Sequence, residues 1–113
     1  MTAKSYIPQK GDIIQMNFNP VKGHEQSGGR PALIISNESY YKKTKLIIVC
    51  PISNTANNFP MHIKLDGRTK TTGSVLTQHI RTVDPAARKI SFIEIMPSEL
   101  TEQVIKNIGL CFI

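Results

Sequence analysis

The sequence contains no tryptophan and few aromatic residues, with three tyrosines and four phenylalanines in 113 residues. It has no run of about 18 apolar residues, so it offers no membrane-spanning helix. Residues 1–10 show no apolar core of a signal peptide, and we expect a cytoplasmic protein. The two cysteines, Cys50 and Cys111, lie in apolar stretches, which predicts two buried thiols rather than a disulfide.

Metal-binding and nucleotide-binding motifs are also absent. The sequence has no HExxH, no CxxC and no Gly-rich phosphate loop. Its three histidines, His24, His62 and His79, are not spaced as metal ligands. We therefore expect neither a metal ion nor another cofactor.

Charge, in contrast, is plentiful and unevenly distributed. The net charge is +6. Residues 42–89 hold nine lysines and arginines against two acidic residues, whereas glutamate outnumbers lysine after residue 90. Such segregation favours a basic face that binds nucleic acid or an acidic polypeptide.

Hydrophobic patterning predicts one α+β domain over residues 1–113. About six short strands are expected, separated by turn residues. They are Asp12–Phe18, Ala32–Ser36, Leu46–Ile52, Met61–Leu65, Ser74–Gln78 and Lys89–Ile95. A helical turn is expected at Asn37–Lys43, with Asn37 as its cap.

A longer helix is predicted near the end of the chain, with Ser98 as its N-cap and Glu99 in its first turn. One helical stripe carries apolar residues and is expected to pack on the sheet. Its members are Leu100, Val104, Ile105, Ile108, Cys111 and Phe112.

The chemically richest segment is the polar, Gly-rich stretch 23–31, between the first two expected strands. It holds an imidazole, a carboxylate, an amide, a hydroxyl and a guanidinium. These groups can move protons and hold an anionic oxygen. Gly29 and Pro31 flank Arg30 and restrict how it is presented.

Several motifs follow one another along the chain: Gly11-Asp12, Pro20-Val21-Lys22-Gly23-His24-Glu25-Gln26, Gly28-Gly29-Arg30-Pro31, Pro51-Ile52-Ser53 and Gln78-His79-Ile80-Arg81. Their order and spacing resemble the MazF/PemK (Kid) family of bacterial toxin endoribonucleases over nearly the whole chain. The resemblance implies an SH3-like barrel or sheet and a homodimer. It also implies sequence-specific, metal-independent cleavage of single-stranded RNA, and an acidic antitoxin that blocks the RNA groove.

The resemblance places Arg30 on the catalytic arginine of the family. A guanidinium can grip two phosphate oxygens at once. Ser53 stands where the family usually carries threonine and keeps the hydroxyl. Glu25 matches the family's Glu-Gln pair and acts as a base or orients Arg30; His24 is either a base or an RNA contact. Further RNA contacts are expected from Lys22, Gln26, Asn54, Gln78 and Arg81.

The sequence departs from the Kid branch at Leu76 and Gln78, where that branch carries an arginine and an aspartate that take part in cleavage. Two alternatives to a ribonuclease therefore stay open. One is a non-catalytic nucleic-acid-binding regulator on the same fold; the other is a gyrase poison like CcdB. The cleavage motif depends on the conformations of the polar segments Asn54–Phe59 and Gly67–Thr72, which the sequence pattern does not predict, and the sequence does not identify the antitoxin.

Overall fold

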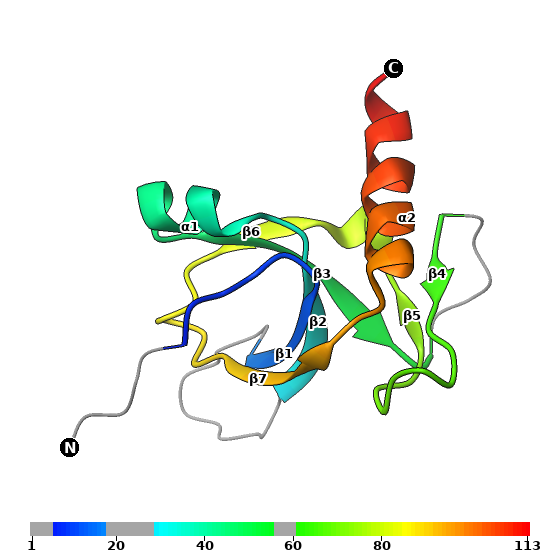
Figure 1. Cartoon of the computed structure of the whole chain (residues 1–113), viewed down its shortest axis with the longest axis horizontal. Coiled ribbons are helices and arrows are strands. Elements are labelled where there is room, and N and C mark those ends of the chain that lie inside the picture. The colour runs from blue at the N-terminus through cyan, green and yellow to red at the C-terminus, as the bar shows by residue number, and fades with distance from the viewer. Residues whose placement is uncertain (1–5, 18–28, 56–60) are drawn as a thin grey trace.

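The structure is a computed structural model that describes residues 6–17, 29–55 and 61–113. Within these ranges, seven strands and two α-helices form one α+β unit (Figure 1). The strands are β1 (Asp12–Asn17), β2 (Gly29–Ile34), β3 (Ile47–Ser53), β4 (Ile63–Lys64), β5 (Ser74–Val75), β6 (Arg81–Val83) and β7 (Ser91–Ile95). The helices are α1 (Glu38–Thr44), between β2 and β3, and α2 (Ser98–Gly109) after β7.

The strands pair antiparallel in the order β4-β5-β3-β2-β1-β7, and β6 pairs with the first half of β3. The α+β prediction is confirmed. Among the described residues the sheet is not closed, since β4 and β7 end the path at opposite edges. The strand count of about six becomes seven. The added strand is β6, whose three residues are too few to give a hydrophobic pattern.

The two faces of the sheet carry separate apolar clusters. One cluster gathers Ile13, Leu33, Cys50 and Ile52 with Val104 of α2. The other gathers side chains that alternate with these along β1, β2 and β3, together with Val83 of β6: Ile14, Met16, Ala32, Ile34, Ile47, Val49 and Val83. Period-two alternation explains both sets, because successive strand residues point to opposite faces.

Helix α2 covers the first cluster through Leu100, Val104 and Ile108, as the predicted stripe requires. Its far end rises away from the sheet in Figure 1. Two parts of that prediction are therefore wrong. Cys111 is exposed rather than buried, and Phe112 is 80% exposed. Neither described helix is long and apolar enough to cross a membrane.

Helix ends were predicted with mixed success. The side chain of Asn37 accepts a hydrogen bond of 2.8 Å from the backbone N–H of Tyr40, so the cap of α1 is confirmed. Ser98 is the first residue of α2 rather than its cap, and Pro97 takes the cap position without a side-chain bond. The carbonyl oxygen of Pro97 accepts the first hydrogen bonds of the helix, from the backbone N–H groups of Leu100 and Thr101.

The Gly11-Asp12 motif serves the fold. Asp12 is 4% exposed, and its carboxylate accepts hydrogen bonds from the Tyr6 hydroxyl and the backbone N–H of Gln9. Burial and the Asp12 carboxylate raise the pKa of Tyr6. Gly11 has φ +95°, which a residue with a side chain rarely adopts. The motif therefore fixes the segment before β1.

Candidate active site

Arg30 lies in strand β2, not in a connecting loop. The strand begins at Gly29, three residues before the predicted start at Ala32. Arg30 pairs with Met16 of β1, and its side chain is exposed. Ladder pairing decided this boundary, since glycine and proline flanking an arginine are weak strand signals. The sheet therefore holds the backbone of Arg30 in a regular position.

Ser53 ends the neighbouring strand β3. The ladder between β2 and β3 ends at the pair Ala32–Pro51, and Arg30 and Ser53 each lie two residues beyond that pair, at the same end of the two strands. Both belong to the face that carries the second apolar cluster, because side chains alternate along each strand. The guanidinium and the hydroxyl therefore lie at one end and on one face of two neighbouring strands.

A short turn orients the Ser53 hydroxyl. Its oxygen accepts a hydrogen bond of 3.1 Å from the backbone N–H of Thr55 and lies 3.0 Å from the Thr55 hydroxyl oxygen. The hydroxyl proton can still rotate toward a phosphate oxygen. Ser53 is half-buried at the end of its strand, which suits a group that meets a substrate.

Four predicted residues lie outside the described residues: Lys22, His24, Glu25 and Gln26. Asn17 and Gly29, the described residues on either side of that segment, are paired in the β1–β2 ladder. The roles predicted for the four side chains stay predictions.

On its other side, Ser53 borders a pocket of about 530 Å³. Its walls come from the end of β3, from β4 and from the turn that leads into β5. The lining residues are Ser53, Asn54, Lys64, Leu65, Asp66, Gly67, Thr69, Thr72, Gly73 and Ser74. Asn54 lines this pocket directly after Ser53, and its predicted contact with RNA stays a prediction. Asp66-Gly67 and Thr72-Gly73 are typical turn residues and predict two turns. No local pattern predicts that the second turn approaches Ser53.

Gly73 makes that approach possible. Its φ is +113°, and a β-carbon there would lie 2.6 Å from the carbonyl oxygen of Ser53. The Thr72 hydroxyl, next in the chain, donates a hydrogen bond of 3.1 Å to Oδ1 of Asn54. The turn before β5 therefore packs directly against the end of β3.

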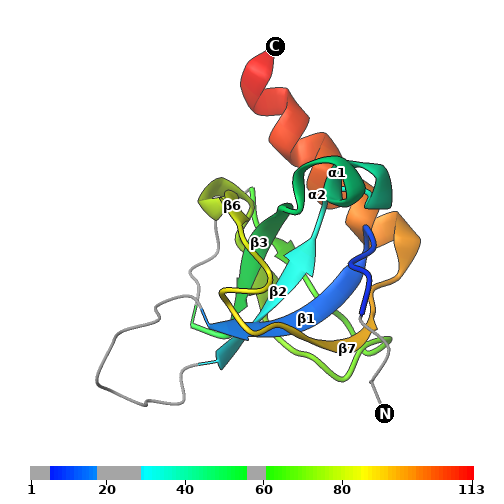
Figure 2. The same cartoon turned by 90° about the vertical axis from the view of Figure 1, so that its left-hand side faces the viewer.

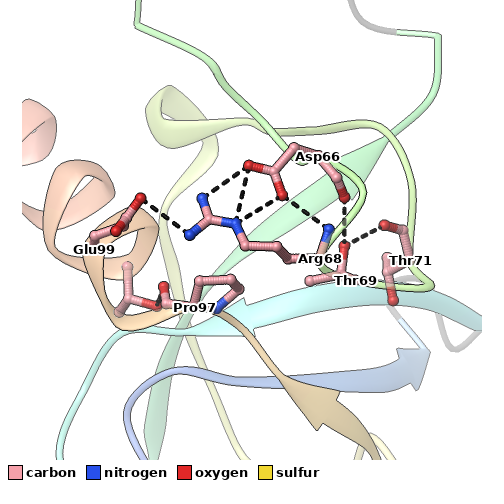
Figure 3. Close-up of polar contacts among 7 residues, drawn as sticks. Asp66, Arg68, Thr69, Thr71, Pro97 and Glu99 are labelled. Carbon is pink, nitrogen blue, oxygen red and sulfur yellow. Dashed lines mark hydrogen bonds and ion pairs between the residues drawn. The ribbon is translucent and has the colours of Figure 1, made fainter.

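The pocket wall is held from outside by an ionic link, drawn in Figure 3. Arg68 binds the Asp66 carboxylate at 2.8 Å and reaches Glu99 of α2 at 3.0 Å. The Arg68 side chain, followed by its backbone N–H, lowers the pKa of Asp66 to about 2. The link therefore joins the turn to the first residues of α2, and Asp66 stays charged at neutral pH.

Glu94 of β7 holds the same turn from a second direction. Its carboxylate accepts hydrogen bonds from the backbone N–H of Lys70 at 3.1 Å, and from the N–H and hydroxyl of Thr71 at 2.8 and 2.7 Å. Desolvation pushes the pKa of Glu94 upward, but the Thr71 and Lys70 hydrogen bonds hold it below its ordinary value.

The remaining predicted RNA contacts lie further along β3. Arg81 begins β6 and pairs with Val49, four residues before Ser53, or about 13 Å along the strand. Gln78 lies in the 3-10 turn Thr77–His79 between β5 and β6. Both side chains are exposed. They lie along the edge of β3 that faces away from β2, and not beside the Arg30–Ser53 pair.

No group of three histidine, cysteine, aspartate or glutamate side chains suited to a metal ion occurs in the described ranges. Cys50 is buried among apolar side chains, as predicted, and burial raises the pKa of its thiol to about 12. A neutral thiol of that kind is a poor nucleophile. The arrangement at hand is thus an arginine, a hydroxyl and a polar pocket.

Comparison with known proteins identifies the family of the chain. The chain is 32% identical over 83 residues to the endoribonuclease toxin MazF of Escherichia coli (strain K12), covering 74% of each chain. The structure matches MazF of Deinococcus radiodurans with a TM-score of 0.83 and 32% identity, covering 95% of this chain and 97% of that one. A MazE–MazF structure from the same organism matches with a TM-score of 0.82 and 27% identity, over 95% and 96% of the two chains. Residues 9–112 match the family model described as PemK-like, MazF-like toxin of type II toxin-antitoxin system, and the chain belongs to that family.

Proposed function

We propose that this protein is an endoribonuclease toxin that cleaves single-stranded RNA at the Arg30–Ser53 end of the sheet. Its relatives are named as endoribonucleases. The observation that carries the proposal is the placement of a guanidinium and a hydroxyl on the same face of two adjacent strands. Neither the gyrase poison nor the non-catalytic regulator is favoured by these relatives.

The RNA supplies its own nucleophile. The ribose 2′-oxygen attacks the adjacent phosphorus, its proton goes to Glu25 or His24, and the 5′-oxygen of the next nucleotide leaves and takes up a proton. Attack from within the substrate needs no captured water, because the nucleophile is already in place. The products are a 2′,3′-cyclic phosphate and a 5′-hydroxyl.

Arg30 and Ser53 stabilise the negative charge that builds on the phosphate oxygens. The guanidinium offers a fixed fork of donors, and the hydroxyl adds one more from the neighbouring strand. Groups held by a sheet need little rearrangement when the charge develops, which is the condition for effective electrostatic stabilisation.

An RNA cleavage assay tests this proposal. Purified protein is incubated with a single-stranded RNA, and with the same RNA carrying a 2′-deoxy sugar at the cleaved nucleotide. We expect cleavage of the first only, with a cyclic phosphate on the 5′ fragment and no loss of activity with a chelator. Cleavage of the deoxy substrate, or full inhibition by the chelator, would contradict the mechanism.

We further propose that the protein acts in the cytoplasm as a homodimer, and that an acidic antitoxin segment neutralises it. The D. radiodurans relative was solved with MazE. The net charge of +6 favours association with an acidic chain. Light scattering of the purified toxin tests the dimer. Competition between an acidic antitoxin peptide and RNA tests the shared groove.

A further inference from the structure

We propose that the pocket beside Ser53 receives one unpaired base next to the scissile phosphate, and that Glu94 is a positioning residue that holds its wall in place. This inference rests on the proposed function. It adds the recognition of a nucleotide to the catalytic pair and assigns a role to a carboxylate on the far side of the turn.

The size and chemistry of the pocket fit a nucleobase. Its volume of about 530 Å³ lies in the range of small-ligand sites, about 300–1,000 Å³. The lining is rich in hydroxyls and includes the Asn54 amide and the Lys64 ammonium. It contains no aromatic side chain, so a base is read through hydrogen bonds to its edge rather than by stacking.

Asn54 is the pocket residue best placed to form a hydrogen bond with the base. Its Oδ1 accepts from the Thr72 hydroxyl at 3.1 Å, which orients the amide and leaves Nδ2, with its two hydrogens, as the donor that can meet a base. Asn54 follows Ser53 directly in the chain. A base bound there therefore belongs to a nucleotide adjoining the phosphate that Ser53 contacts.

The wall opposite β3 is the turn that leads into β5. Hydrogen bonds to Glu94 of β7, outside the pocket, hold this turn. Lys70 and Thr71 donate three hydrogen bonds to Glu94, and these residues come immediately before Thr72. Loss of the carboxylate frees the backbone on which Thr72 stands. The Thr72–Asn54 bond then weakens, and the base loses its fixed partner without a direct change in the pocket.

Matched variants test this role. One carboxylate oxygen of Glu94 accepts from Lys70 and the other from Thr71, so Glu94→Gln removes the charge and replaces one of the two acceptors with an NH₂ donor. Glu102→Gln makes the same charge change on α2, at an exposed glutamate that pairs with Lys10. Each protein cleaves a randomised single-stranded RNA, and the fragment ends are sequenced. Steady-state constants are then measured on the preferred substrate.

For Glu94→Gln we expect the preference at one position beside the cleavage site to fall about tenfold, with a higher KM and little change in kcat. Glu102→Gln keeps the wild-type profile. Thr71→Val, which removes only the hydroxyl donor, gives a smaller loss in the same direction and serves as the test if Glu94→Gln does not fold. An unchanged profile and KM in the folded variants would overturn the inference.

Binding gives a readout that is independent of cleavage. A short RNA with a 2′-deoxy sugar at the cleavage site is titrated into labelled wild-type protein and followed by NMR. We expect shifts of the Asn54 side-chain amide and of the Thr72 and Gly73 backbone amides. Shifts at Arg30 without shifts at these residues would contradict the base pocket alone, whereas a wild type that neither binds nor cleaves RNA contradicts the proposed function as well.

Discussion

The two sides of β3 are held in different ways. On one side, β2 brings Arg30 to the same end of the sheet as Ser53 through a ladder whose side chains, such as Ala32 and Leu33, are fully buried. On the other side, the pocket wall is fixed by exposed or half-buried polar links from Arg68 and Glu94. The proposed catalytic pair thus rests on core packing, whereas the proposed recognition wall rests on contacts that charge, salt and pH can change.

The largest expected effect is on the catalytic side. Arg30→Ala should lower the rate of RNA cleavage by about 10²–10³, the loss typical of a donor to a developing oxyanion. The side chain is exposed, so the variant should unfold at a urea concentration close to that of the wild type. Single-turnover cleavage measures the rate.

Arg30→Lys is the control, since it keeps the charge and loses the two-pronged geometry. Its rate should lie between those of the wild type and Arg30→Ala. A folded Arg30→Ala protein with near-normal cleavage would remove Arg30 from the mechanism and the β2 side from the active site.

A smaller effect is expected at Ser53. Ser53→Ala should slow cleavage by about tenfold or more, because one donor to the phosphate is lost while Arg30 remains. Ser53→Thr should keep most activity, since the hydroxyl stays and threonine suits a strand end. The same single-turnover assay compares both variants with the wild type. Inactivation by threonine would show that the hydroxyl is not the group in use.

The sequence predicted the ladder side of the site better than the pocket side. Period-two alternation and turn residues identified β1, β2 and β3 within a few residues, and Arg30 and Ser53 stood out beside them. The pairing of β2 with β3 was not predicted, because no local pattern states which strands are adjacent. Strand β6 also depends on its long-range pairing with β3, because three residues are too few to show a strand pattern.

The pocket side could not be predicted for a different reason. The Glu94–Thr71 bonds join residues 23 apart in the chain, and the Arg68–Glu99 pair joins a turn to a helix. Such contacts leave no periodic trace in the sequence. The C-terminal stripe failed at Cys111 and Phe112 because helical periodicity continues past the point at which α2 leaves the sheet (Figure 2).

Two glycines in the segment between β4 and β5, Gly67 and Gly73, test how the pocket wall is held through their effects on the free energy of unfolding. Gly73→Ala should lower the free energy of unfolding by about 1–3 kcal/mol, because alanine there has both an unfavourable φ and a backbone clash with Ser53. Gly67→Ala meets nothing within 4 Å and should stay within about 0.5 kcal/mol of the wild type. Urea unfolding measures both. Equal effects at the two positions would show that the turn does not need its close approach to β3.

The smallest expected effect is a pH dependence at Glu94. Its hydrogen bonds hold its folded pKa below the ordinary value of 4.5. The carboxylate therefore adds stability that is fully present above the unfolded pKa and is lost as the pH falls through the folded pKa. The contribution should be below about 1 kcal/mol, because the bonds lie near the surface. The free energy of unfolding is compared for wild type and Glu94→Gln at neutral pH and near pH 4, with Glu102→Gln as the matched control. The difference between wild type and Glu94→Gln should shrink on acidification, and that for Glu102→Gln should change less. If the Glu94→Gln difference instead grew in acid, the carboxylate would not be the form that holds the pocket wall, and the polar side of β3 would need another support.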